Sequence, residues 1–388
     1  MFGGRDMNKQ KKYVLYFITG FTILSMNTIA WSPVKRLTWS TPDSNYPDIA
    51  IGSGDKIHVV WDEGGANTRE IFYKSSTDSG ATWSGKKRLT WNSGNSQRPA
   101  AAADSLNQIH VVWDDYTPGN QEIFYKRSTD GGLNWSPLTR LTWSSDASRH
   151  PDIAIDSSNN VHVVYHELRS SDNDIFYKKS TDGGTSWTAV KTLTWNTGQS
   201  EDVAIATAGS SFVHIAWQDD SPGNDEIFYK RSTDGGVNWD AVKRLTWNSG
   251  VSKYAKITAA PNGYVYITYQ DNSIGNNEIY VRKSSDGGAS WLVVQRMTWS
   301  PTDSMYPEIT SDSTNIIHFT WTDSKDGGYE IYYKKSTNNG TSWSVITRVT
   351  WNSTFSLYPA SACDSINKFH LVWMDNYPPI YEIYYKNN

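Results

Sequence analysis

The sequence predicts an all-β protein folded as a seven-bladed β-propeller, and two observations support this prediction. A tripeptide related to Leu-Thr-Trp recurs seven times at a constant spacing of 52 residues. Within each unit, apolar residues alternate with polar ones and turn residues interrupt the alternation, which indicates four short strands. A four-stranded sheet cannot bury both of its faces alone, so seven such units favour blades that pack around a ring.

Tryptophans mark the repeat in three columns, which together contain all nineteen tryptophans of the chain. The first column ends the tripeptide and comprises Trp39, Trp91, Trp143, Trp195, Trp247, Trp299 and Trp351. The second, eight residues earlier, comprises Trp31, Trp83, Trp135, Trp187, Trp239, Trp291 and Trp343. The third comprises Trp61, Trp113, Trp217, Trp321 and Trp373, with Tyr165 and Tyr269 in the two remaining units. We expect rings of this size in the core, so the sequence predicts that all three columns are buried.

The second unit illustrates the four expected antiparallel strands. They are placed at residues 98–103, 109–113, 122–127 and 137–143. The propeller begins with an isolated fourth strand at residues 31–39, and the chain ends after a third strand at 382–386. If these two strands pair, the ring closes without a free edge, whereas the rival arrangement, an open solenoid, leaves both edges unpaired.

The first thirty residues differ in composition from the rest. Three lysines at positions 9, 11 and 12 precede an apolar run at residues 13–26, and a small residue, Ala30, ends the segment. This is the layout of a secretory signal peptide, with Met7 as an alternative start. The run is shorter than the roughly 20 residues that span a bilayer, so cleavage is favoured over a retained membrane anchor.

From this pattern we expect a signal peptide at residues 1–30 and a propeller at residues 31–388. The mature protein is then secreted, periplasmic or on the cell surface, without a membrane span. The single cysteine, Cys363, excludes a disulfide framework, a cysteine-based zinc site and an iron–sulfur cluster. The formal charge of −4 shows no basic excess, which argues against a nucleic-acid partner. We expect a monomer.

A turn motif, Ser-x-Asp-x-Gly-x-x-Trp, separates the third and fourth strands of six units. Its acidic position is occupied by Asp78, Asp130, Asp182, Asp234 and Asp286, and by Asn338 in the sixth copy. The carboxylate can accept hydrogen bonds from amides of its own turn, the glycine permits a positive φ, and the tryptophan packs under the hairpin. The sequence therefore predicts a structural role for these residues.

The motif resembles the Asp box, or BNR repeat, of the sialidase superfamily of β-propellers, and the resemblance covers the mature chain. Asp boxes occur in propellers that cleave glycans and in propellers that only bind or scaffold. Sialidases use an arginine triad, a tyrosine–glutamate nucleophile pair and an acid/base aspartate, and residues 149–151 are similar to their Arg-Ile-Pro motif. The catalytic candidates that the resemblance implies are Arg98, Arg149, Asp202 and Tyr254.

Chain direction places the Asp boxes on one face of the ring and the loops before the first strands on the opposite, top face. Those top-face loops vary between units, as a single binding site requires. The predicted binding residues are Tyr46, Arg98, Arg149, His150, Glu201, Asp202, Lys253, Tyr254, Tyr306 and Tyr358.

Two acidic columns flank each loop between the second and third strands, beginning with Glu63 and Glu70. They could bind calcium, but turn capping and a cross-strand ion pair with the basic column of the fourth strand are favoured. A histidine column at the start of the second strands is expected to pack, and His150 and His166 alone stand outside it. We therefore expect no cofactor or metal, with calcium as the alternative.

Equal loop lengths in all seven units leave no insertion from which to build a deep glycan pocket. The sequence therefore predicts a non-catalytic binding or scaffolding propeller that recognises a glycan or a surface protein on its top face. One alternative is a sialidase-like glycoside hydrolase. Another is a multivalent lectin with one site per blade, which requires aromatic rings exposed to solvent.

Overall fold

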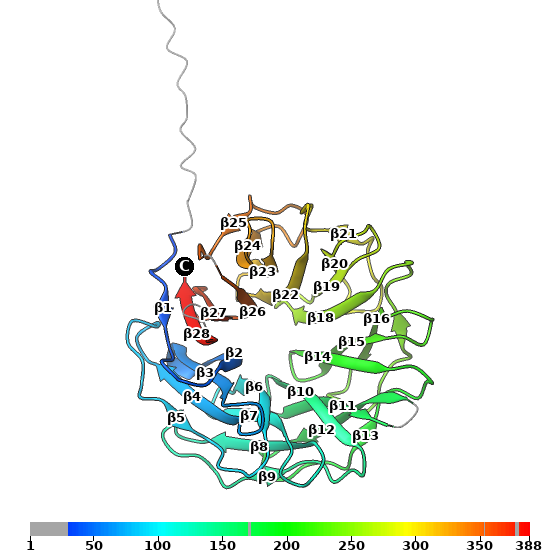
Figure 1. The fold of residues 1–388 in the computed structure, drawn as a ribbon. Helices are drawn as coiled ribbons and strands as arrows, with labels where there is room; N and C mark the ends of the chain where they lie inside the picture. Colours follow the sequence, from blue (N-terminus) through cyan, green and yellow to red (C-terminus); the bar gives the residue numbers. More distant parts are fainter. Residues whose placement is uncertain (1–29, 170–171, 353, 377–379) are drawn as a thin grey trace, which may run out of the picture. The chain divides into compact units, whose positions relative to one another are not determined.

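The computed structural model describes residues 30–169, 172–352, 354–376 and 380–388. Apart from Ala30, the expected signal peptide lies outside the described residues. Residues 31–388 form one compact unit, a ring of seven four-stranded antiparallel sheets (Figure 1), which confirms the predicted seven-bladed propeller. Among the described residues the only helical turn is η1 (Ser53–Asp55), and none of their helices has the length and apolarity to cross a membrane.

Each blade contributes one strand to each of four concentric layers (Figure 1). The innermost strands are β2 (Ser44–Gly52), β6 (Ser96–Ala103), β10 (Ala147–Ile155), β14 (Ser200–Ala208), β18 (Ser252–Ala259), β22 (Ser304–Ser311) and β26 (Ser356–Cys363). The second strands are β3 (Lys56–Glu63), β7 (Ile109–Asp115), β11 (Val161–Leu168), β15 (Phe212–Asp219), β19 (Val265–Asp271), β23 (Ile317–Asp323) and β27 (Phe369–Asp375).

The two outer layers contain strands of very different length. The third strands are β4 (Glu70–Ser76), β8 (Glu122–Ser128), β12 (Asn173–Ser180), β16 (Glu226–Ser232), β20 (Glu278–Ser284), β24 (Glu330–Ser336) and β28 (Glu382–Asn387). The fourth strands have two residues each: β5 (Lys87–Arg88), β9 (Thr139–Arg140), β13 (Lys191–Thr192), β17 (Lys243–Arg244), β21 (Gln295–Arg296), β25 (Thr347–Arg348) and β1 (Lys35–Arg36).

The ring closes as the sequence predicts. Strand β1 pairs antiparallel with β28, with Lys35 opposite Tyr385 and Arg36 opposite Tyr384, and completes the sheet of β26, β27 and β28. The first and last segments of the propeller therefore share one blade, and β28 is not left as an unpaired edge.

The fourth strand is much shorter than the predicted span 137–143, for a local reason. In the second blade, Leu141 N still donates to Ile123 O at 2.8 Å, but the Ile123 amide donates to the Thr142 hydroxyl at 2.8 Å. A side chain has therefore replaced the backbone acceptor, so regular pairing ends at Arg140 although the chain still follows β8.

The hydrophobic core lies between neighbouring blades. One cluster combines Val60 and Ile71 of the first blade with Val111 and Trp113 of the next. All five tryptophans of the third column are at most 1% exposed, as predicted. Each blade therefore packs against both of its neighbours, as expected for a ring of repeated blades.

The first tryptophan column contradicts the prediction of burial, because its seven rings are between 65% and 74% exposed. In the tripeptide at residues 37–39, Leu37 enters the inter-blade core and the Thr38 hydroxyl accepts the Ile383 amide at 2.8 Å. Leu37 and Thr38 thus make the inward contacts of the tripeptide, and the tryptophan that follows is left at the surface. The Trp39 ring lies at the rim, with Lys74 Nζ 5.4 Å from its centroid.

The Asp boxes form compact turns. In the first copy, Asp78 Oδ1 accepts the Thr82 amide and the Ser76 hydroxyl, each at 2.8 Å. Hydrogen bonds from Thr82 lower the pKa of Asp78 to about 2. Gly80 has φ +80°, and a Cβ there would lie 2.3 Å from the Tyr385 ring, so the turn needs glycine for conformation and for space.

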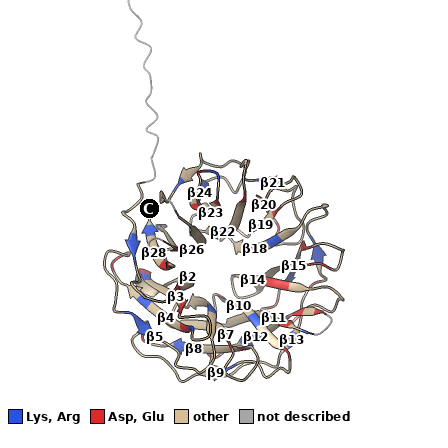
Figure 2. Ribbon diagram, in the orientation of Figure 1, with Lys and Arg blue, Asp and Glu red and all other residues tan. Residues whose placement is uncertain are grey.

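The expected ion pair between the third and fourth strands is present. In the second blade, Arg140 Nη2 lies 2.8 Å from Glu122 Oε1, and five other blades repeat this pair. Thr192 replaces the arginine in the third blade, where Arg169 contacts Asp174 instead, at 3.0 Å. Figure 2 also shows acidic residues on β14 and basic residues on the neighbouring β18, where the blades lose their equivalence.

Candidate binding site at the channel mouth

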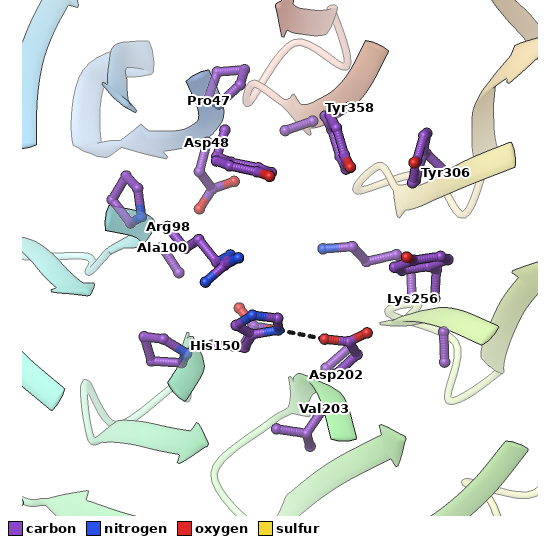
Figure 3. A pocket seen from close by; sticks show the side chains of 18 of the residues that line it. Pro47, Asp48, Arg98, Ala100, His150, Asp202, Val203, Lys256, Tyr306 and Tyr358 are labelled. Carbon is purple, nitrogen blue, oxygen red and sulfur yellow. Dashed lines mark hydrogen bonds and ion pairs between the residues drawn. The ribbon is translucent and has the colours of Figure 1, made fainter. Parts of the chain in front are cut away.

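A cavity of about 350 Å³ opens where the seven innermost strands begin (Figure 3). Every blade contributes to its wall through the same repeat positions. The first of these positions holds Tyr46, Arg98, His150, Asp202, Tyr254, Tyr306 and Tyr358, which we call the mouth ring.

All seven residues of the mouth ring adopt the left-handed backbone conformation, with φ between 46° and 55°. None is glycine, so each conformation costs on the order of 1–2 kcal/mol. Each coincides with a register shift in its strand, such as that between Gln97 and Ala100 in β6. The bulge turns the side chain out of the normal alternation and toward the channel mouth.

The neighbouring blade holds this backbone conformation in place. The Arg98 amide donates to Asp62 Oδ2 at 3.0 Å, and the Tyr254 amide donates to Gln218 Oε1 at 3.1 Å. These acceptors belong to one column on the second strands of the preceding blades. In the third blade that column holds His166.

One half of the mouth ring is aromatic. Tyr254, Tyr306, Tyr358 and Tyr46 follow one another with ring centroids 5.3, 4.2 and 5.0 Å apart. Arg98 extends this arc, since its guanidinium lies 5.5 Å from the Tyr46 centroid. The result is a continuous wall of four rings on one side of the cavity.

The other half carries ionisable groups. His150 Nδ1 is hydrogen-bonded to Asp202 Oδ1 (Figure 3), and the His150 and His166 ring centroids are 5.0 Å apart. Burial would raise the pKa of Asp202, but the hydrogen bond and charge of His150 lower it overall. His166 is 2% exposed, and burial lowers its pKa to about 3. The imidazole of His166 is therefore neutral.

Four further charges lie two positions beyond the mouth ring, at Asp48, Asp152, Lys256 and Glu308. Burial, with a smaller contribution from neighbouring carboxylates, raises the pKa of Asp48 to about 6 and that of Glu308 to about 8. Burial opposes the charge on Lys256, but Glu308 and the aspartates raise its pKa overall. Asp48 Oδ2 also accepts the Ala101 amide of the next blade at 2.7 Å.

The structure brings seven of the ten predicted binding residues into the cavity wall, namely the mouth ring. Arg149, Glu201 and Lys253 each precede a ring residue, at the start of the register shift in its strand, and do not line the cavity. Glu201 accepts a hydrogen bond from Asn173 at 2.6 Å, and Lys253 pairs with Asp225 at 3.0 Å.

Of the catalytic candidates implied by the sialidase resemblance, Arg98, Asp202 and Tyr254 line the cavity and Arg149 does not. Arg149 lies opposite His166 in the β10–β11 register. The described part of the chain thus brings only one arginine, Arg98, into the cavity wall.

Sequence reasoning did not select Asp48, Asp152 and Lys256 as lining residues. A signal for them exists, because their column reads Asp48, Ala100, Asp152, Ala204, Lys256, Glu308 and Ala360. Charge at four positions and alanine at three is the same asymmetry that distinguishes the mouth ring. A column-by-column search for unlike residues would have found it.

A family model described as a BNR repeat-like domain matches residues 57–267 and, in an overlapping second match, residues 125–319. Among curated proteins, the xyloglucanase Xgh74A of Acetivibrio thermocellus is 27% identical over 273 residues. That match covers 62% of this chain and 31% of the relative, so the chain spans less than a third of the length of the curated relatives it matches.

Solved structures with similar folds include a polysaccharide lyase, a sialidase and an arabinanase. A polysaccharide lyase of family PL25, an ulvan lyase, has a TM-score of 0.66 at 9% identity, covering 89% of this chain and 93% of its own. A Hadza microbial sialidase has a TM-score of 0.54 at 14% identity, covering 86% and 73%. The α-L-arabinanase of Penicillium chrysogenum has a TM-score of 0.53 at 16% identity, covering 75% and 92%. At these identities the likeness establishes a shared propeller fold.

Proposed function

The chain belongs to the BNR repeat-like family of β-propellers, and from this premise we propose that it is an exported glycan-binding protein with one binding site at the mouth of its central channel. The observation that carries the proposal is the division of the mouth ring. Four tyrosines form one wall, and Arg98, His150 and Asp202 form the facing part. Seven blades of the same fold, with unlike residues at this position, therefore create one asymmetric site per molecule.

This division suits a sugar. Aromatic rings offer apolar faces against which the C–H face of a pyranose can pack, and a few converging polar groups fix its orientation. The Arg98 guanidinium and the Asp202 carboxylate can pair with hydroxyl or carboxylate groups of the ligand. The cavity of about 350 Å³ has room for a short stretch of a glycan chain rather than a long one.

Substitutions at the adjacent residues Tyr254 and Lys253 provide a matched test of the proposed site, because only Tyr254 lines the cavity. Residues 31–388 would be screened on a glycan array with and without calcium, and any hit measured by calorimetry. Tyr254→Ala should weaken binding about tenfold, or 1.4 kcal/mol, because it removes one ring of the wall. Lys253→Ala, one residue earlier and outside the cavity, should leave binding unchanged.

Arg98→Ala should weaken binding from the other side of the cavity. A glycan whose binding survives both Tyr254→Ala and Arg98→Ala does not use this site, and the proposal fails. A bound glycan that is recovered intact supports a binding protein. A cleaved one would instead favour a hydrolase or lyase, with the His150–Asp202 pair as its acid–base candidate.

The seven exposed tryptophans favour a second candidate, a multivalent lectin with one site per blade. Each ring is a solvent-facing aromatic surface at the rim. Trp39 follows β1 of one blade, whereas Lys74 beside it belongs to β4 of the next, so each site spans two blades. A lectin with one site per blade requires exposed aromatic rings of this kind, on which a sugar can stack.

Binding stoichiometry separates the two candidates. The channel-mouth site predicts one glycan per propeller, and the rim sites predict seven. Trp247→Ala should remove one equivalent of seven if the rim binds the ligand. A stoichiometry of one that Trp247→Ala does not change excludes the rim sites.

A further inference from the structure

His150 and His166 are the two histidines that lie outside the repeated histidine column. They lie on β10 and β11 of the third blade, and Asp202 lies on β14 of the fourth. One possible ligand atom from each of the three side chains lies within 4.8 Å of the other two. Three residues that break the repeat thus converge on one point beside the cavity.

We propose that His150, His166 and Asp202 bind one divalent transition-metal ion of the zinc class, with one coordination position open to the channel mouth. Two imidazoles and a carboxylate are typical zinc ligands, and three protein ligands leave a tetrahedral ion one free position. Calcium and magnesium prefer oxygen ligands throughout, so this cluster does not suit them.

His166 gives a second, independent reason. Its side chain is 2% exposed, yet Nδ1 has no hydrogen-bond partner among the described residues. A buried polar atom without a partner costs about 1–3 kcal/mol, and a bound ligand would remove that cost. The hydrogen bond between His150 and Asp202 accounts for those two residues but leaves Nδ1 of His166 unexplained.

The geometry needs only a small adjustment. Zinc bonds to nitrogen and oxygen of about 2.0–2.2 Å place neighbouring tetrahedral ligand atoms about 3.4 Å apart. Side-chain rotation can therefore close the present separations of up to 4.8 Å. His150 and Asp202 line the cavity and His166 does not, so the open position faces the space in which a ligand would lie.

The test is a titration of metal-free residues 31–388 with Zn²⁺ alone, without sugar, so its outcome does not depend on the proposed glycan. Calorimetry should show one zinc ion per chain, and zinc but not calcium should raise the melting temperature. The repeat itself supplies a conservative variant, because the fourth and fifth units hold Gln218 and Gln270 at the position of His166.

His166→Gln should weaken zinc binding by more than about 100-fold, since losing only an outer-shell partner of a zinc ligand costs about 10–100-fold. Asp202→Asn should also lose high affinity, whereas Glu201→Gln, on the neighbouring residue outside the cavity wall, should retain it. Absence of zinc binding overturns the proposal. Zinc binding that persists unchanged in both His166→Gln and Asp202→Asn also overturns it, because the ion then occupies another surface.

Discussion

Four of the seven innermost strands carry a charged residue two positions beyond the mouth ring, where the other three have alanine. One ammonium group, that of Lys256, faces the three carboxyl groups of Asp48, Asp152 and Glu308. If all four groups were charged, two negative charges would stay uncompensated in a buried environment. One of the carboxyl groups should therefore hold a proton near neutral pH. Glu308 is the best candidate, because burial and the two aspartates raise its pKa to about 8.

Glu308 should make stability fall as the pH rises. Its folded-state pKa of about 8 exceeds the ordinary value of 4.5, so the stabilisation is complete below pH 4.5 and is lost as the pH rises through 8. Glu308→Gln removes this dependence, so it should unfold at higher urea than the wild type at pH 8, and the gain should shrink at pH 5. We expect a difference on the order of 1–2 kcal/mol, reduced by solvent in the channel. A gain that is equal at both pH values would contradict the assignment.

The sequence singles out the variable residues of the mouth but not the directions of their side chains. His150 and His166 are visible as the histidines outside the repeated column, and Tyr254 and Asp202 as unlike residues at one position. Strict alternation, however, does not show which of Arg149 and His150 faces the channel. That choice depends on the register shift between Arg149 and Asp152, a bulge whose left-handed residue is stabilised by a neighbouring blade.

At the scale of strands, hydrophobic alternation predicts the three inner layers well because ladder pairing and burial coincide there. Strands β6, β7 and β8 begin within two residues of the predicted starts at 98, 109 and 122. The predicted length of the fourth strand is wrong because a side chain, the Thr142 hydroxyl, ends its backbone hydrogen-bond ladder. The sequence pattern does not reveal this change, because threonine is compatible with a strand in either case. The amide of the neighbouring strand can bond to the backbone or to the threonine hydroxyl, and the apolar tripeptide looks the same.

Thr142 should therefore contribute more to the free energy of unfolding than its small side chain suggests. Its hydroxyl accepts the Ile123 amide and donates to Glu122, and the side chain is 2% exposed. Thr142→Val keeps the shape and leaves a buried amide and a carboxylate oxygen each without this partner. We expect a loss of about 2 kcal/mol in the free energy of unfolding, measured by urea denaturation.

The control is Thr139→Val in β9, a half-buried threonine of the same fourth strand. A valine there should change stability by less than about 0.5 kcal/mol, as surface substitutions usually do. Equal effects at positions 139 and 142 would show that the hydroxyl at 142 does not replace a ladder acceptor.

At the scale of the whole molecule, the residues that repeat in every blade and the residues of the proposed binding site lie in different parts of the blade. The inter-blade core and the Asp boxes repeat because each blade must fit the next in the same way. The seven rim tryptophans repeat as well, although they are exposed. The mouth of the channel, in contrast, combines unlike residues from different blades, so a single binding centre can arise there without any insertion in the loops.

Closure of the ring gives the last prediction. Residues 31–39 contribute β1, the buried Leu37, and Trp31, whose ring lies 5.2 Å from that of Tyr333. Arg36 also pairs with Glu382 at 2.7 Å. Deleting this segment leaves β28 as an unpaired edge and removes the partner of a buried carboxylate.

We therefore expect the deletion of residues 31–39 to abolish the cooperative unfolding transition or to cause aggregation, measured by calorimetry and light scattering. A chain that lacks only residues 1–30 should unfold in one cooperative transition, because every contact of the seam remains. The seam makes the first and last segments interdependent, so even a short deletion at one terminus should affect all seven blades through the ring. A melting curve that is unchanged by the loss of residues 31–39 would show that the pairing of β1 with β28 does not hold the propeller closed.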